Sequence, residues 1–219
     1  MGKPDGVQFL LRDRRISQST LADTNLIGAE FIGCEFVAIV FRGVEFNDGK
    51  FRRCRFDGCA FERCFLQDAR MDQCDVIDSN FAGSGLQSLG ASGSTFERVD
   101  FSRADLTKSM FFESIFVDCR FDNAKLKRSD FTKCRLHECS FRSANAARAD
   151  FADSDLRGAD FDAMFFENTK FTRCGLAGIR GLPKNVMGAV LTEPDCSEGF
   201  DGSGIVSETV VLRGWAGQG

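Results

Sequence analysis

Ten cysteines and a single histidine are the side chains with the clearest chemical potential in this sequence of 219 residues. Cysteine and histidine are the usual ligands of structural zinc, and a cysteine beside a histidine can act as a nucleophile. His137 lies between Cys134 and Cys139, so this segment is the first candidate for such chemistry. No C-x-x-C pair occurs, however, and the spacing of the cysteines follows a different rule.

Nine of the ten cysteines stand at one phase of a five-residue period. They are Cys34, Cys54, Cys59, Cys64, Cys74, Cys119, Cys134, Cys139 and Cys174. Alanine, serine and threonine fill most of the other positions of that phase, which is typical of a small buried side chain. We therefore expect core packing rather than a metal site or disulfides, with His137 pointing away from the two neighbouring thiols. Unpaired thiols favour a reducing cytoplasm, and Cys196 alone lies outside the repeat.

A large apolar residue follows each small position by two residues. Every fifth residue from Leu11 to Leu176 is apolar, at 34 positions without an insertion or deletion, and 19 of the 24 phenylalanines lie there. Residues two apart on an extended chain share a face. A period of five fits neither a helix nor a flat strand. The pattern predicts a coil of short strand-and-turn sides, stacked so that like residues lie over like.

These units resemble the pentapeptide-repeat family, whose consensus is Ala-(Asp/Asn)-Leu-X-X. Good matches are Ala104-Asp105-Leu106-Thr107-Lys108, Ala149-Asp150-Phe151-Ala152-Asp153 and Ala159-Asp160-Phe161-Asp162-Ala163. The resemblance implies an all-β fold, a right-handed quadrilateral β-helix with four pentapeptides in each coil of 20 residues. Residues 11–180 then make about 8.5 coils of this solenoid.

Both open ends of such a helix need a cap. Residues 1–10 are the expected N-terminal cap, with Val7, Phe9 and Leu10 lying across the first coil. Residues 181–219 are expected to form a short capping helix over 182–191, and then an acidic, glycine-rich tail with a strand over 204–215. Three alternatives stay open for that strand, which holds the only tryptophan, Trp215: it folds back, pairs with a second subunit, or binds another partner.

Composition argues against catalysis. Tyrosine is absent, and no catalytic constellation, phosphate-binding loop or metal site is evident. We therefore expect a non-enzymatic protein without a cofactor or a metal. No run of 18 apolar residues indicates a membrane span, and the N-terminus lacks the apolar core of a secretory signal.

Charge can be analysed by column, because residues 20 apart should stack. Glu35, Arg55 and Asp75 alternate in one column, whereas Lys108, Arg128 and Arg148 form a basic one. Residues 11–180 carry 25 basic and 26 acidic side chains, so the surface is mixed, and opposite charges interspersed among the basic columns argue against direct nucleic-acid binding. The candidate partner surface comprises four acids of the more acidic side, two apolar neighbours and the tail tryptophan: Glu35, Asp75, Asp78, Asp118, Ile115, Val117 and Trp215.

The resemblance also suggests what such a rod binds. Gyrase-protecting members of the family resemble DNA and occupy the DNA-binding site of a type II topoisomerase. The first hypothesis is therefore a cytoplasmic protein-binding rod that mimics DNA, binds DNA gyrase or topoisomerase IV and protects against gyrase poisons. The alternative is an interaction scaffold or regulator of another protein, without DNA mimicry. Gyrase-binding relatives dimerise through their C-terminal regions, so a homodimer through residues 181–219 is a further hypothesis.

Overall fold

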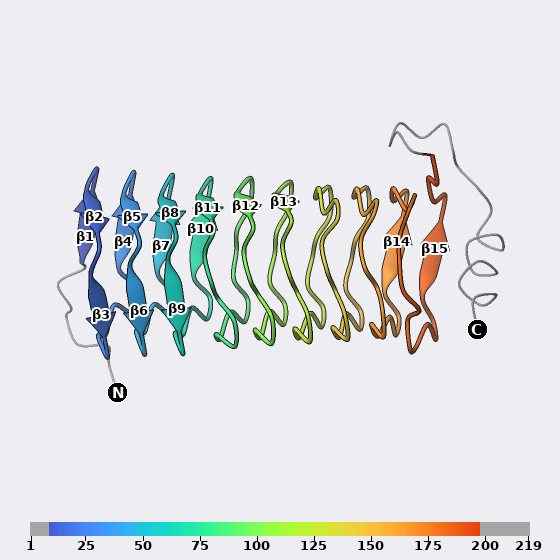
Figure 1. The fold of residues 1–219 in the computed structure, drawn as a ribbon, viewed down its shortest axis with the longest axis horizontal. Coiled ribbons are helices and arrows are strands. Elements are labelled where there is room, and N and C mark those ends of the chain that lie inside the picture. Colours follow the sequence, from blue (N-terminus) through green and yellow to red (C-terminus); the bar gives the residue numbers. More distant parts are fainter. Residues whose placement is uncertain (1–8, 198–219) are drawn as a thin grey trace.

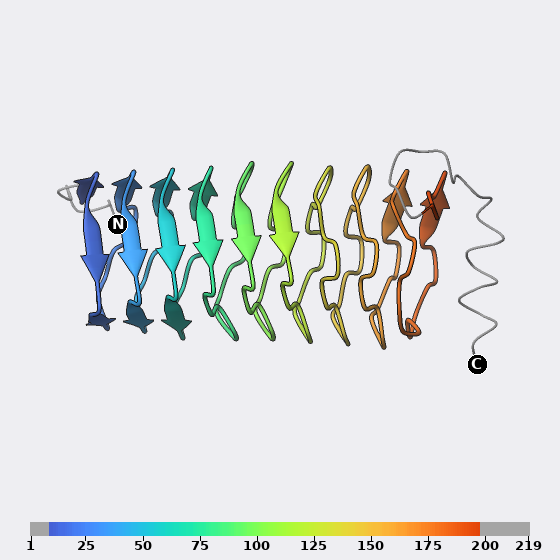
Figure 2. The same ribbon diagram turned by 45° about the horizontal axis from the view of Figure 1, so that its top comes forward.

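A computed structural model describes residues 9–197, which wind into a four-sided parallel β-solenoid of about nine turns (Figures 1 and 2). Each turn takes 20 residues, so Phe31 pairs with Phe51 and Phe51 with Met71 in successive coils. The expected β-helix is confirmed. With coils about 4.8 Å apart, the rod is roughly 45 Å long. None of the described residues belongs to a helix long and apolar enough to cross a membrane.

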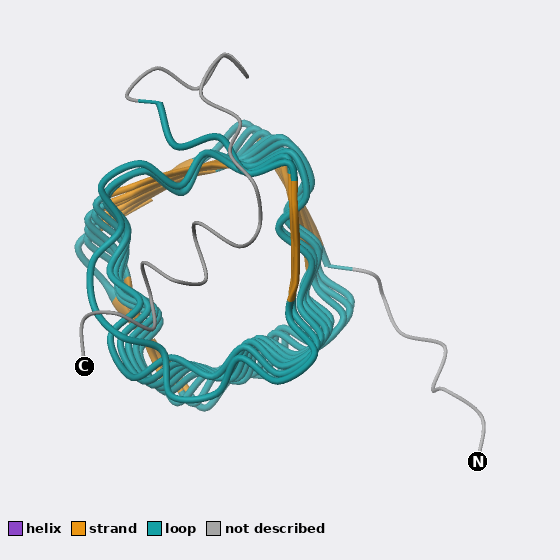
Figure 3. Cartoon of the chain, turned by 90° about the vertical axis from the view of Figure 1, so that its right-hand side faces the viewer, coloured by secondary structure: helices purple, strands orange, loops and turns teal. Residues whose placement is uncertain are grey.

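Three of the four faces contain strands (Figure 3). We number the faces in chain order, so that residues 10–13, 15–18, 20–23 and 25–28 begin the first, second, third and fourth faces. The first face holds β1 (Leu10–Arg12), β4 (Glu30–Ile32), β7 (Lys50–Arg52), β10 (Arg70–Asp72), β14 (Lys170–Thr172) and β15 (Val190–Thr192). The second holds β2 (Arg15–Ser17), β5 (Glu35–Val37), β8 (Arg55–Asp57), β11 (Asp75–Ile77), β12 (Thr95–Glu97) and β13 (Ile115–Val117). The third holds β3 (Thr20–Ala22), β6 (Val40–Arg42) and β9 (Ala60–Glu62). The fourth is linked by isolated bridges such as Asn25 to Glu45.

The core is a stack of phenylalanine rings. Phe96 and Phe116 lie one above the other with ring centroids 4.8 Å apart and planes 7° apart. Within one coil the rings meet edge to face, as Phe111 and Phe116 do at 5.3 Å. Both arrangements are favourable for aromatic pairs. At the N-terminal end Phe9 packs on Phe31 with ring centroids 5.6 Å apart, Leu10 belongs to β1, and Val7 lies outside the described residues.

A left-handed residue turns each corner. From Asp13 to Glu193, every fifth residue except Pro183 has a positive φ, and the non-glycine values lie between 47° and 62°. No valine, isoleucine, threonine or aromatic residue occupies any of these positions. β-Branched and bulky side chains are the ones that this conformation disfavours most. The corner therefore selects glycine, alanine and polar residues that are not β-branched.

Asparagine and aspartate favour turns over strands on the sides where their side chains form a local hydrogen bond. At the first outward position of a side, the Asp or Asn side chain accepts a hydrogen bond from the backbone N–H two residues later, as Asp100 does from Ser102 at 2.8 Å. This local bond competes with regular strand geometry. Eleven sides carry it, and none of them is a strand: those of Asn25, Asn80, Asp100, Asp105, Asp130, Asn145, Asp150, Asp155, Asp160, Asn185 and Asp195.

The expected capping helix over 182–191 is wrong. Residues 190–192 form β15, which pairs in parallel with β14, and bridges from Phe165 to Asn185 and from Gly175 to Asp195 continue the solenoid. Pro183 cannot adopt the left-handed corner conformation, so Gly181 takes a φ of 81° in its place. This one irregular side interrupts the sequence pattern, but Leu191 returns to the core with 3% exposure.

Candidate partner-binding surface

The cysteines are packing residues, as the spacing predicts. Nine are buried, and their thiols donate to backbone carbonyls 23 residues earlier, as Cys59 Sγ does to Phe36 O at 3.3 Å. Burial raises the pKa of Cys134 to about 12, which leaves this thiol protonated and unreactive near neutral pH. His137 is exposed, so it is not packed against the buried thiols on either side. Residues 9–197 contain no group of histidine, cysteine and acidic side chains that could hold a metal.

The second face brings six of the seven predicted surface residues together. Glu35, Asp75 and Ile115 belong to β5, β11 and β13 and share one outward column, because these strands pair in register with β8 and β12 between them. Val117 lies two residues beyond Ile115 on the same strand. The seventh residue, Trp215, lies outside the described residues.

Asp78 and Asp118 occupy the left-handed corner at the edge of the second face, with Arg98 in the coil between them. Arg98 donates to both carboxylate oxygens of Asp78, at 2.6 and 2.9 Å, and also contacts Glu97. These hydrogen bonds lower the pKa of Asp78. Asp118 has no ion pair with any described residue, so its charge is available to a partner.

The second face is the only one with a marked net charge over the described residues. It carries nine carboxylates and five arginines, whereas acids and bases balance on the other three. The carboxylates are Glu35, Asp57, Asp75, Asp78, Glu97, Asp118, Glu138, Asp155 and Asp195, and the arginines are Arg15, Arg55, Arg98, Arg135 and Arg157. Ion pairs neutralise several of these acids, including Glu35, which lies 3.5 Å from Arg15. Asp75, Asp118 and Glu138 form none with the described part of the chain.

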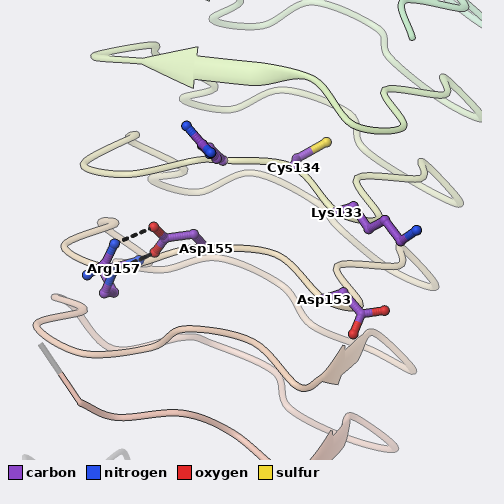
Figure 4. A pocket seen from close by; sticks show the side chains of 6 residues that line it. Lys133, Cys134, Asp153, Asp155 and Arg157 are labelled. Carbon is purple, nitrogen blue, oxygen red and sulfur yellow. Dashed lines mark hydrogen bonds and ion pairs between the residues drawn. The ribbon is translucent and has the colours of Figure 1, made fainter. Parts of the chain in front are cut away.

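A hollow of about 360 Å³ opens between the first and second faces (Figure 4). Asp155 and Arg157 lie side by side in it, joined by hydrogen bonds of 2.8 and 2.6 Å. Burial alone would raise the pKa of Asp155, but the hydrogen bonds and charge of Arg157 outweigh it and lower the pKa. A carboxylate held ionised in this way is a poor general acid. We therefore interpret Asp155 and Arg157 as a structural ion pair that lines the hollow.

An apolar patch turns the corner between the first and second faces. Met110 and Phe112 are 43% and 39% exposed on the first face, and Val117 is 41% exposed on the second, with Ile115 between them. The five-residue period places Phe112, Ile115 and Val117 at outward positions, although only Ile115 and Val117 were predicted to form a patch. Lys133 Nζ lies 5.1 Å from the centre of the Phe112 ring. These four apolar side chains lie on either side of the corner residue Glu113 at mid-rod, and we call them the corner patch.

Comparison with known proteins agrees with this architecture. A family model described as a pentapeptide repeat region matches residues 24–111 and 114–180. The chain belongs to the pentapeptide-repeat family. No match to a curated protein was found.

Solved structures of pentapeptide-repeat proteins are similar to the chain to different degrees. A trypsin-treated form of QnrB1, a plasmid-mediated fluoroquinolone resistance protein, has a TM-score of 0.76 and 19% identity over 84% of this chain and 92% of that one. HetL, involved in heterocyst differentiation regulation in the cyanobacterium Nostoc sp. strain PCC 7120, has a TM-score of 0.41 and 14% identity, over 92% and 94% of the two chains. At these identities the similarity to QnrB1 establishes a common fold.

Proposed function

We propose that this pentapeptide-repeat protein is a non-catalytic, protein-binding rod of the cytoplasm, and that the second face is its binding surface. The observation that carries the proposal is the gathering of unpaired acids and apolar side chains on this face. Stacked repeats create a long continuous surface whose outward residues vary without disturbing the core. Asp75, Asp118 and Glu138 supply charge that no described residue neutralises, and Ile115 and Val117 supply apolar contact area.

The proposed partner is a type II topoisomerase, DNA gyrase or topoisomerase IV, bound at its DNA-binding site. The family and the fold shared with a fluoroquinolone resistance protein support this partner. The net charge of the second face, compared with that of DNA, indicates how such binding would work. Duplex DNA carries about 26 charges along roughly 45 Å. The second face carries a net of only four negative charges. Binding must therefore depend on shape and on a few unpaired acids, with a shallower salt dependence than that of DNA itself.

A gyrase supercoiling assay, with and without a fluoroquinolone and over a range of salt concentrations, tests this partner. We expect micromolar protein to inhibit supercoiling or to protect the enzyme from the drug, and the effect to weaken as salt rises. The variant D75N/D118N/E138Q should lose most of the effect. The control D23N/D100N/D162N removes the same charge from the third face and should retain it. No effect of the unmodified protein, or equal loss in both variants, would contradict the proposal.

The corner patch favours a second candidate, an interaction scaffold for a protein that does not bind DNA. Apolar contacts persist at high salt, whereas electrostatic mimicry does not. If this candidate holds, the rod has no effect on supercoiling, and an identified partner remains bound at 1 M salt and is lost from the variant F112K/V117K. Loss of that partner from D75N/D118N/E138Q instead would locate the contact at the acids.

A further inference from the structure

The ion pairs of the rod are distributed unevenly over its faces. Thirteen ion pairs join described residues, and twelve lie on the first, second and third faces. On those faces opposite charges alternate along a column, as Arg173 does with Asp153 at 2.6 Å. The fourth face holds a single pair, Lys125 with Asp105 at 3.3 Å.

Charges on the fourth face are separated by sign instead. Its N-terminal half carries Glu45, Asp48 and Asp68, and its C-terminal half carries four basic side chains and one acid, Glu167, outside the one ion pair. The row between the halves is uncharged and consists of Gly85, Gln87 and Ser88. The four basic residues are Lys108, Lys127, Arg128 and Arg148.

The basic half surrounds a hollow of about 380 Å³, lined by these four side chains together with Thr107, Ala147 and Glu167. Lys108 and Arg128 lie in successive coils, about 4.8 Å apart along the rod. Asp68 lies two coils from Lys108, about 10 Å away, and Asp48 lies four coils from Arg128, about 19 Å away. Separations of this size reach or exceed the screening length of about 8 to 10 Å in physiological salt. The two halves therefore do not neutralise each other within one chain.

We propose that two copies of the chain associate antiparallel through the fourth face. A two-fold axis along the row of Gly85, Gln87 and Ser88 places each column over itself in reverse order. Asp68 of one copy then faces Lys108 of the other, and Asp48 faces Arg128, each contact occurring twice. A parallel arrangement would oppose like charges. The arrangement is isologous, so it closes at a dimer.

The same geometry sets the strength of the dimer. Phe65, which is 52% exposed in the acidic half, would be covered by the row of Asp105 and Thr107 of the other copy. The overlapping rows 25–145 span about 29 Å, and a side is about 13 Å wide. The interface therefore buries on the order of 400 Å² from each copy, which is the size of a weak, reversible contact. We expect a micromolar dissociation constant and strong salt dependence.

Sedimentation velocity of the full chain between 1 and 100 μM tests the proposal. At 50 mM NaCl we expect a monomer–dimer equilibrium, which shifts to monomer at 500 mM NaCl. The variants D48K/D68K and K108D/R128D should each be monomeric, because their faces oppose like charges. An equimolar mixture of the two should form a heterodimer, since every reversed residue then meets its complement. Lysine and aspartate already occur at this left-handed position, so both variants should fold, as circular dichroism can verify.

The control R53D/R63D reverses two unpaired arginines at the same corner position on the first and third faces, and it should dimerise like the unmodified chain. Three results would overturn the proposal: a monomer at 100 μM and 50 mM NaCl, a dimer that both reversal variants retain, or a mixture that forms no heterodimer. The second result would favour the homodimer through the C-terminal region, much of which lies beyond the described residues.

Discussion

At the scale of single residues, the small inward position explains the unusual cysteine content. Most of these positions hold alanine, serine, threonine or cysteine, and Cys134 shares its column with Ser114 and Ser154. Cys134 Sγ and Ser154 Oγ both donate to a backbone carbonyl 23 residues earlier, at 2.8 and 2.5 Å. The thiol therefore acts as a small hydrogen-bonding core side chain, and its chemistry appears only when the fold opens.

Alkaline pH should reveal this burial. The unfolded Cys134 thiol ionises near 9.0, whereas the folded thiol keeps its proton until about 12. Since the unfolded state binds fewer protons in this interval, the free energy of unfolding falls as pH rises, by about 1.4 kcal/mol per pH unit for each such thiol. Cys134→Ser should make the fall between pH 9 and 10.5 shallower by about this slope in urea titrations. Cys196→Ser, at an exposed thiol whose pKa burial raises less than that of Cys134, should change the slope less, and equal slopes in all three proteins would contradict the prediction.

At the scale of one five-residue side, the left-handed corner is the most constrained element. Gly83 has a φ of 70°, and a Cβ added there would meet nothing within 4 Å, so conformation rather than space limits substitution. Gly83→Val should lower the free energy of unfolding by about 1 to 2 kcal/mol. Gly83→Asn should cost well under half of that, because asparagine tolerates this region. Urea unfolding of the two variants measures the difference, and equal losses would show that corner conformation is not the cause.

The sides also show how far the sequence predicts the structure. The five-residue period predicted the inward residues and a coil of stacked sides, and the resemblance to the pentapeptide-repeat family implied that residues 20 apart stack. The period failed at Pro183, where a corner without a left-handed residue resembled the start of a helix. The side chains of Asn185 and Asp195 were the signal that the coils continue, because each accepts the same local hydrogen bond as earlier sides.

The candidate surface could be predicted only in outline. The order of residues in each column predicted that Glu35 and Asp75 share one face, but it did not predict which acids form ion pairs. That choice depends on side-chain reach: Arg98 binds Asp78 rather than Asp118, although both lie one coil away. The basic column of Lys108 was visible in the sequence. Its acidic counterpart on the same face became apparent only when the faces were compared.

At the scale of the whole molecule, each coil contacts only its neighbours, so stability should vary along the rod. Leu136 is fully buried between coils, whereas Leu21, in the first coil of the described residues, is only partly buried against the core. Leu136→Ala should therefore cost about 2 to 5 kcal/mol, and Leu21→Ala well under 2 kcal/mol.

Hydrogen exchange locates these losses. We expect β11, β12 and β13 to exchange most slowly and β1, β2 and β3 most rapidly, because within residues 9–197 the first coil pairs on one side alone. Leu136→Ala should speed exchange in coils on both sides of the substitution. Leu21→Ala should affect β3 and β6 alone, and uniform acceleration along the rod in both variants would show that the solenoid unfolds as one unit.

The core of this rod repeats every five residues, but its surface repeats every twenty. Deletion of one complete five-residue side, such as residues 84–88, would keep every later phenylalanine in the interior. It would also rotate the whole downstream surface by one face, so that Lys108 would leave the column of Asp68 while the fold persisted. A length change of five, ten or fifteen residues therefore preserves the fold but disrupts the arrangement of the binding surface. A change of exactly twenty residues preserves both. During evolution such rods should accordingly gain and lose whole turns. Selection on binding, rather than on stability, then maintains the alignment of outward residues every 20 residues.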